Sequence, residues 1–240
     1  MSNDTVVVLF KGGRLPSWHG LTSAQRDDYE RTHVDLMLSV ALEHKMMRLE
    51  GYRLIGSQEH WGRFWVIEFP TLSGAEAWID AEIEPPFGAH GQFEYHLARR
   101  WVPRHLAGLA TGPPRRRRQP GVDPHEIPGL DVDRSKVVVL HFGRHLAPDD
   151  VAARTTADES HARVLARLAE EYGLARLEGF RLMTPQPGWQ WVYVGELPSF
   201  DGAEAWAEAE TGTDRQAGIA ATVFLSRRWA PDYFDLWSPE

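Results

Sequence analysis

The sequence contains no cysteine, which excludes disulfides, thiolate metal sites, iron–sulfur clusters and cysteine nucleophiles. It also has no apolar run long enough for a membrane-spanning helix. The first residues, MSNDTVVVLF, have neither the basic start nor the long apolar stretch of a signal peptide. We therefore expect a cytoplasmic protein without a membrane partner.

Positive charge is in the minority. The chain has 26 Lys and Arg residues against 34 Asp and Glu residues, a formal net charge of −8, whereas nucleic-acid binding needs a basic face. The run Arg115–Arg118 lies in a stretch rich in Pro and Gly and is interpreted as solvated. Glycine-rich phosphate loops and metal-spaced histidines such as H-E-x-x-H are also missing. The sequence therefore predicts neither a nucleic-acid partner nor a metal site.

What the sequence does contain is a second copy of itself. Residues 46–82 reappear at 174–210 with a constant offset of 128 and no gap, and LARRWVP at 97–103 returns as LSRRWAP at 225–231. Upstream, TVVVLFKGG matches KVVVLHFGR at an offset of 131. This self-similarity indicates a tandem duplication. The expected segments are a first repeat at 1–103, a Pro/Arg-rich linker at 104–135, a second repeat at 136–231 and a C-terminal tail at 232–240.

Both repeats show the same order of predicted elements. In the first, hydrophobic periodicity and turn signals predict strands at Val6–Phe10, Tyr52–Ile55, Phe64–Phe69 and Phe93–Trp101, a helix from Ser23 to about Met47 that is capped by Thr22 or Ser23 and ended by Gly51, and a short helix after Thr71 or Ser73. The order β-α-β-β-α-β is that of a ferredoxin-like unit. We therefore predict an α+β fold in which two tandem ferredoxin-like units form an intramolecular pseudo-dimeric barrel, as a monomer or a homodimer.

A histidine recurs near the start of the long helix. His33 follows Glu30 by three residues, and the offset of 128 places His161 after Asp158 in the same way. Residues at this spacing share one face of a helix. The pair is either an ion pair that stabilises the helix start or an imidazole that a carboxylate orients for acid–base chemistry. The sequence leaves both interpretations open.

A family resemblance adds to this reading. The segments ERTHVDLMLSVALEHKMMRLEGYRLIGS and PTLSGAEAWIDAEIEPPFGAHGQFEYHLARRW resemble the YCII-related family of dimeric α+β barrels. EthD-like and antibiotic-biosynthesis monooxygenase barrels are the nearest relatives of similar appearance. The resemblance implies an active-site pair of a helix histidine, matched by His33, and the aspartate of an Asp-Pro step. Glu84 stands at that step here, and the second repeat offers only Glu210 or Asp214.

Arginine and tryptophan side chains supply candidates for substrate binding. Arg99 and Arg100 recur in the second repeat, and one of two neighbours on a strand faces inward. An inward arginine would bind a carboxylate or phenolate, or would pair with a glutamate of the short helix. Among the ten tryptophans, Trp61 and Trp65 are further candidates because surplus aromatic residues often line pockets for flat ligands.

These observations lead to one main hypothesis and two alternatives. The main hypothesis is a cofactor-independent lyase- or isomerase-type enzyme that acts on an aromatic or polyketide-like metabolite in the cavity between the sheets. His33 would be its general acid/base. The alternatives are a non-catalytic binding protein for a hydrophobic metabolite and a haem-binding barrel of the same fold class.

Overall fold

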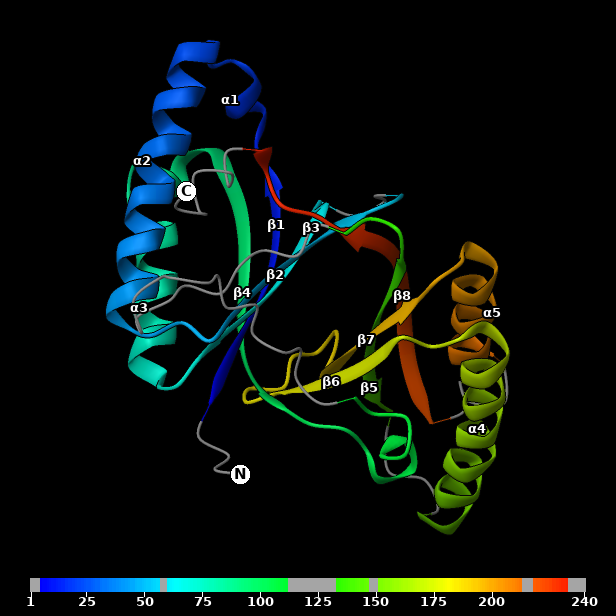
Figure 1. Cartoon of the computed structure of the whole chain (residues 1–240). Helices are drawn as coiled ribbons and strands as arrows, with labels where there is room; N and C mark the ends of the chain where they lie inside the picture. Colours follow the sequence, from blue (N-terminus) through cyan, green and yellow to red (C-terminus); the bar gives the residue numbers. More distant parts are fainter. Residues whose placement is uncertain (1–4, 57–59, 112–132, 147–150, 213–217, 233–240) are drawn as a thin grey trace, which may run out of the picture.

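The computed structural model describes residues 5–56, 60–111, 133–146, 151–212 and 218–232. Eight antiparallel strands form a closed barrel in the order β1-β3-β2-β8-β5-β7-β6-β4, with one helix pair on each side (Figure 1). The first half contains β1 (Val6–Arg14), α1 (Pro16–His19), α2 (Ser23–Glu43), β2 (Arg48–Leu54), β3 (Arg63–Phe69), α3 (Leu72–Ile83), the 3-10 helix η1 (Phe87–His90) and β4 (Gly91–Arg100). The 3-10 helix η2 (Arg104–Leu106) leads to the second half, with β5 (Val137–His145), α4 (Val151–Tyr172), β6 (Arg176–Leu182), β7 (Trp191–Leu197), α5 (Phe200–Thr211) and β8 (Ile219–Arg228).

Alternation along the strands divides the apolar side chains between two environments. In β1, Val7 and Leu9 belong to the core inside the barrel, whereas Val6, Val8 and Phe10 pack in the core that lies against the helices. The cause is the two-residue period of a strand, which sends successive side chains to opposite faces. The barrel interior is therefore one core, and the helices of each half cover another. The expected α+β class is confirmed.

The helix starts follow their capping residues. Thr22 caps α2 in a reciprocal arrangement with Gln25, and the hydroxyl of Thr71 accepts the backbone N–H of Gly74 in α3. The predicted end of the long helix was wrong. The helix ends at Glu43, and Lys45 then adopts a left-handed backbone with φ of 54° that turns the chain toward β2.

Gly51 lies inside β2, at a seam between the two halves. A Cβ atom there would lie 2.3 Å from the carbonyl oxygen of Trp229, whose own N–H donates to the carbonyl of Gly51 at 2.9 Å. Gly179 has the matched contact with Trp101 at the other seam, where the Trp101 N–H donates to Gly179 at 2.8 Å. These two glycines therefore permit the close backbone approach that joins the halves.

The two seams have the same register. At one seam β2 pairs with β8, and at the other β4 pairs with β6, each through three residue pairs. The pair Tyr52–Arg228 at the first corresponds, at the offset of 128, to Phe180–Arg100 at the second. Most of the expected linker (112–132) and of the C-terminal tail (233–240), including Arg115–Arg118, lies outside the described residues. Among the described helices, none has both the length and the hydrophobicity required to cross a bilayer.

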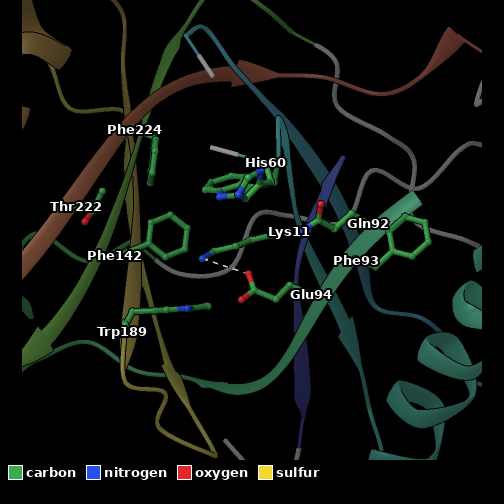
Figure 2. Close-up of a pocket in the computed structure, with 11 residues that line it drawn as sticks. Lys11, His60, Gln92, Phe93, Glu94, Phe142, Trp189, Thr222 and Phe224 are labelled. Atoms are coloured by element: carbon green, nitrogen blue, oxygen red, sulfur yellow. Dashed lines mark ion pairs between the residues drawn. The ribbon is translucent and has the colours of Figure 1, made fainter. Parts of the chain in front are cut away.

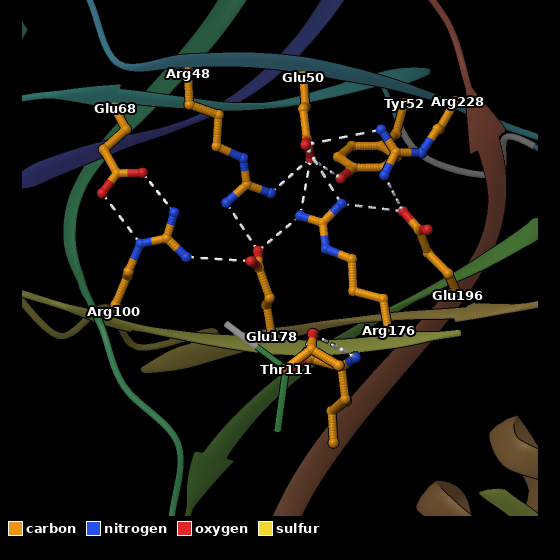
Figure 3. Close-up of polar contacts among 11 residues, drawn as sticks. Arg48, Glu50, Tyr52, Glu68, Arg100, Thr111, Arg176, Glu178, Glu196 and Arg228 are labelled. Carbon is orange, nitrogen blue, oxygen red and sulfur yellow. Dashed lines mark hydrogen bonds and ion pairs between the residues drawn. The ribbon is translucent and has the colours of Figure 1, made fainter. Parts of the chain in front are cut away.

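A charged network fills one part of the barrel interior (Figure 3). Its four arginines and four glutamates are related in pairs by the offset of 128: Arg48, Glu50, Glu68, Arg100, Arg176, Glu178, Glu196 and Arg228. Burial alone would raise the pKa of Glu50 and Glu178, but the guanidinium groups around them, first among them Arg48, hold both pKa values below the usual range. Because the four positive and four negative charges balance and the groups bond to one another, the network can occupy this part of the barrel interior.

Candidate functional site

Each half contains a histidine–glutamate pair between its two helices. In the first half, Nε2 of His33 in α2 lies 3.1 Å from Oε2 of Glu82 in α3. In the second, Nε2 of His161 in α4 lies 3.1 Å from Oε2 of Glu210 in α5. Both histidines are buried, at 8% and 9% exposure. The two pairs correspond at the offset of 128, so they occupy equivalent places in the two halves.

The carboxylate bonded to His33 differs from the two that were expected. Glu30 is half-buried, and its burial raises its pKa while Arg14 opposes that rise. Glu84 is exposed and caps the end of α3. Glu82 was missed although its signal was present: the segment AEAWIDAE that ends at Glu82 returns as AEAWAEAE, which ends at Glu210.

The expected partner of His161 also differs. Oδ2 of Asp158 lies 3.6 Å from Nδ1 of His105, which follows β4 in the chain. His161 instead bonds to Glu210, one of the two counterparts weighed from the sequence. The other, Asp214, lies outside the described residues.

A second imidazole joins the pair in the second half. Nδ1 of His141 in β5 lies 3.2 Å from the same oxygen of Glu210 that His161 contacts, and the side chain of Glu210 is fully buried. Nε2 of His141 is also buried, with no hydrogen-bond partner among the described residues. In the first half Phe10 stands at the matched position of β1. Only the second half therefore places a carboxylate between two imidazoles.

The first-half pair lines a small cavity, and the second half has a much larger cavity whose lining includes Asp158, three residues before His161 in the same helix. The first-half cavity, about 40 Å³, is lined by Phe10, Arg14, Tyr29, His33, Leu49, Arg63, Trp65, Ile67, Trp78, Glu82, Phe93 and Pro231. The second-half cavity, about 700 Å³, is lined by Trp101, Pro103, Arg104, His105, His145, Thr155, Asp158, Glu159, Trp191, Tyr193 and Ile219. Pro103 and Pro231 correspond at the offset of 128, as do Tyr193 and Trp65, so both cavities lie in equivalent places between helix and sheet.

Two aromatic side chains that line the first-half cavity have small counterparts in the second half. Tyr29 and Phe93 fill the first-half cavity, and both positions are alanine in the second half, Ala157 and Ala221. Tyr29 is fixed there because its hydroxyl donates to the carbonyl of Phe87 at 2.5 Å, and burial raises the pKa of this hydroxyl. Two rings that line the first-half cavity are thus absent from the second half, whose cavity has a volume typical of small-molecule sites.

The second-half cavity has flat aromatic walls. The rings of Trp101 and Tyr193 are nearly parallel, with centroids 6.2 Å apart, and the ring of His145 lies 4.6 Å from that of Trp191. The indole N–H of Trp191 is buried without a hydrogen-bond partner among the described residues. Arg104 contributes a cation to the lining. Such walls suit a flat ring system that carries an anionic group, because rings stack on its faces while the guanidinium binds the anion.

The expected substrate-binding residues lie in several places. Arg99 donates to the backbone carbonyl of Thr5 at 2.7 Å. Arg100 points into the barrel and donates to Glu68 on β3 and to Glu178 on β6, in the charged network. The pairing of Arg100 with strand glutamates was not expected, because the sequence pointed to glutamates of the short helix as the alternative partners.

The two candidate tryptophans are separated from each other. Trp61 lines a cavity at one end of the barrel, together with Trp189 of the second half. Trp65 lines the small first-half cavity and packs edge-on against Trp229, with ring centroids 6.0 Å apart. Among the described residues, no group of three or more His, Cys, Asp and Glu side chains is arranged to hold a metal ion.

No protein-family model and no curated protein sequence matches the chain. Solved structures do share its fold. A point mutant of chlorite dismutase from Candidatus Nitrospira defluvii aligns over 98% of this chain and 94% of its own, with a TM-score of 0.68 and 12% identity. The same enzyme in complex with imidazole aligns over 99% and 96%, with a TM-score of 0.67 and 13% identity. A mutant of it in complex with cyanide aligns over 96% and 92%, with a TM-score of 0.61 and 13% identity.

These similarities correct two expectations. The assignment to the YCII-related family was wrong, because the structures that match nearly the whole length of this chain are chlorite dismutases. The motifs behind that assignment are short and mostly structural. They indicate a βαββαβ unit but do not distinguish between families that contain it. The expectation of no cofactor is contradicted as well, because chlorite dismutase-like proteins are haem-dependent. At 11–13% identity the likeness establishes a shared fold for this chain.

Proposed function

We propose that the protein binds one haem per chain, in the second-half cavity between α4 and the sheet. The observation that carries this proposal is a buried imidazole–carboxylate pair, His161 with Glu210, beside a cavity of about 700 Å³ with aromatic walls. Haem iron needs one axial ligand from the protein, and histidine is a common one. The similarity in fold to chlorite dismutases agrees with this assignment.

His161 would hold the haem iron through its imidazole. It follows Asp158, which lines the cavity, by three residues and so shares its helix face. In the first half the matched residues, His33 and Glu82, both line the first-half cavity. Glu210 would fix the orientation of the His161 ring and raise its basicity, as carboxylates do for metal-bound histidines. His141 shares this carboxylate and adds a hydrogen-bonding group behind the ligand.

The cavity lining fits the remaining parts of haem. Trp191 and Tyr193 would pack against the ring, and Arg104 would bind a propionate. Asp158, with His105 beside it at 3.6 Å, would hold or release a proton at the cavity wall. When bound, haem supplies an iron centre for one-electron and oxygen chemistry.

We also propose that the halves derive from a duplication and have diverged in function. The repeats at 1–103 and 136–231 keep the histidine–glutamate pair, but the first-half cavity, at about 40 Å³, has no room for a flat cofactor. In this proposal His33 and Glu82 join α2 to α3, and the first half supports the barrel.

Titration with haemin tests the proposal. We expect the purified chain to bind one equivalent with a sharp Soret band, and His161→Ala to weaken binding at least tenfold. His33→Ala is the matched control and should bind as the wild type does. Imidazole and cyanide should shift the spectrum of the loaded protein, because both bind chlorite dismutase structures. Absence of a stoichiometric Soret complex, or equal effects of the two alanine variants, would refute the proposal.

A further inference from the structure

A third cavity opens at one end of the barrel, away from the helices (Figure 2). Its volume is about 380 Å³, within the range of small-molecule sites. Both halves contribute to its lining: Lys11, His60, Trp61, Gln92, Phe93, Glu94, Phe142, Gly188, Trp189, Thr222 and Phe224. It shares no residue with the second-half cavity, so ligand binding there is separate from haem binding.

Aromatic rings surround the ammonium group of Lys11. Its Nζ lies 5.2 Å from the ring centroid of Trp61, 4.7 Å from that of Phe142 and 4.8 Å from that of Trp189. The lysine side chain is 13% exposed. Cation–π attraction holds the charge at this place. Because little of the lysine side chain is exposed to water, an anion that reaches Lys11 is attracted more strongly than it would be in bulk solvent.

Glu94 supplies the carboxylate that is nearest to Lys11 in Figure 2. Its Oε2 lies 3.5 Å from Nζ, and its other oxygen lies 3.7 Å from Nε2 of His96. The Glu94 side chain is 56% exposed. An ion pair with such an exposed partner contributes little stability, so Glu94 can turn into solvent at small cost. It therefore stands where the anionic group of a ligand would bind.

We propose that this cavity binds a small aromatic carboxylate. The carboxylate of the ligand would replace that of Glu94 on Lys11, and its ring would pack against Trp61, Trp189 and Phe224. A cationic ligand is disfavoured because the ammonium of Lys11 already occupies the aromatic cage. The charge of Lys11 and the flat walls together select the class of ligand: one negative charge on a flat ring.

Benzoate and its neutral analogue benzamide provide the probes. The full chain is titrated with each, and binding is followed by the indole N–H signals of Trp61 and Trp189, assigned from the variants Trp61→Phe and Trp189→Phe. We expect benzoate to bind at least tenfold more tightly than benzamide, because a partly buried charged contact exceeds a neutral one by about that factor. Lys11→Met should abolish the difference, and Glu94→Gln should tighten benzoate binding several-fold.

Two controls keep the test decisive. Lys136→Met removes the same charge from a residue outside the cavity and should leave benzoate binding unchanged. Lys11→Arg keeps the charge and should retain the preference for benzoate, which separates loss of charge from loss of fold if Lys11→Met proves unstable. Equal binding of benzoate and benzamide, unmoved Trp61 and Trp189 signals, or full benzoate binding by Lys11→Met would overturn the proposal.

Discussion

Arg176 in β6 donates to both carboxylate oxygens of Glu50 in β2, at 3.3 and 2.9 Å, so that a cation of one half is held by an anion of the other. Arg48 and the hydroxyl of Tyr52 bond to the same carboxylate, at 2.5 and 2.6 Å. Glu50 therefore joins the two halves of the charged network, as does Glu178, which contacts Arg48 at 2.8 Å and Arg100 at 3.1 Å (Figure 3). Removal of Glu50 should affect the whole barrel.

We expect Glu50→Gln to lower the free energy of unfolding by about 3–5 kcal/mol, because it leaves buried guanidinium groups without their counter-charge. Urea denaturation followed by circular dichroism measures this change. Glu94→Gln, which removes an exposed carboxylate, should change stability by no more than about 0.5 kcal/mol. A loss below about 1 kcal/mol for Glu50→Gln would show that the network contributes little.

Acid should weaken the barrel through the same network. The pKa values of Glu50 and Glu178 are held below the usual range in the folded chain, while the unfolded chain takes up these protons near pH 4.3, roughly the value of a free glutamate. The unfolded state therefore binds more protons below that pH. The stabilisation is complete above about pH 4.3 and falls as the pH drops toward the folded pKa values.

Urea midpoints measured from about pH 6 down to pH 3 test this dependence. We expect a nearly constant contribution from these groups down to about pH 4.5 and a steep decline below it. Glu50→Gln should show a shallower decline, since one of the groups responsible is gone. A midpoint that stays constant between pH 4.5 and 3 contradicts the prediction.

Filling the second-half cavity should prevent haem binding without unfolding the protein. Ala221 corresponds to Phe93, whose ring helps to fill the first-half cavity, and it lies two residues after Ile219 on the same strand face. We expect Ala221→Phe to lower haemin affinity at least tenfold, with a melting temperature close to that of the wild type. Ala220→Phe, on the opposite strand face, is the control. Unchanged haem uptake by Ala221→Phe would place the cofactor elsewhere.

Glu210 should act on haem through His161, as a positioning residue. Glu210→Gln removes the negative charge shared by His161 and His141, so we expect a 10–100-fold loss of haem affinity, the range seen for outer-shell partners of metal ligands. The iron–histidine stretching frequency of the loaded protein should fall, because the ligand becomes less basic. Glu82→Gln makes the matched change in the first half and should alter neither quantity. An unshifted frequency in Glu210→Gln would remove Glu210 from this role.

Much of the fold could be predicted because its signals are local. The apolar run that begins at Val6, the cap at Thr22 and the alternation from Phe64 to Phe69 each specify an element within a few residues. Gly51 misled the prediction, since a glycine after a helical pattern suggests a helix end. Its actual role depends on Trp229, far away in the chain.

The site was harder to predict because its partners lie far apart in the sequence. His33 and Glu82 are separated by 49 residues, whereas Glu30 was favoured for being three residues away. The repeat contained the answer, since Glu82 and Glu210 are identical at the offset of 128. The role of His141 had no such signal, because its counterpart is Phe10. Cavity size also escaped prediction, since it depends on rings packed from several elements.

The closed strand order has a consequence for how the chain is made. β2 has β8 as one of its two neighbours, and β8 is the last of the eight described strands along the chain. Until β8 has left the ribosome, the backbone groups of β2 at that seam have no strand partner, and an unpaired edge favours association with other chains. The barrel can therefore close only after β8 has been made, and chains cut short before β8 should be prone to aggregate.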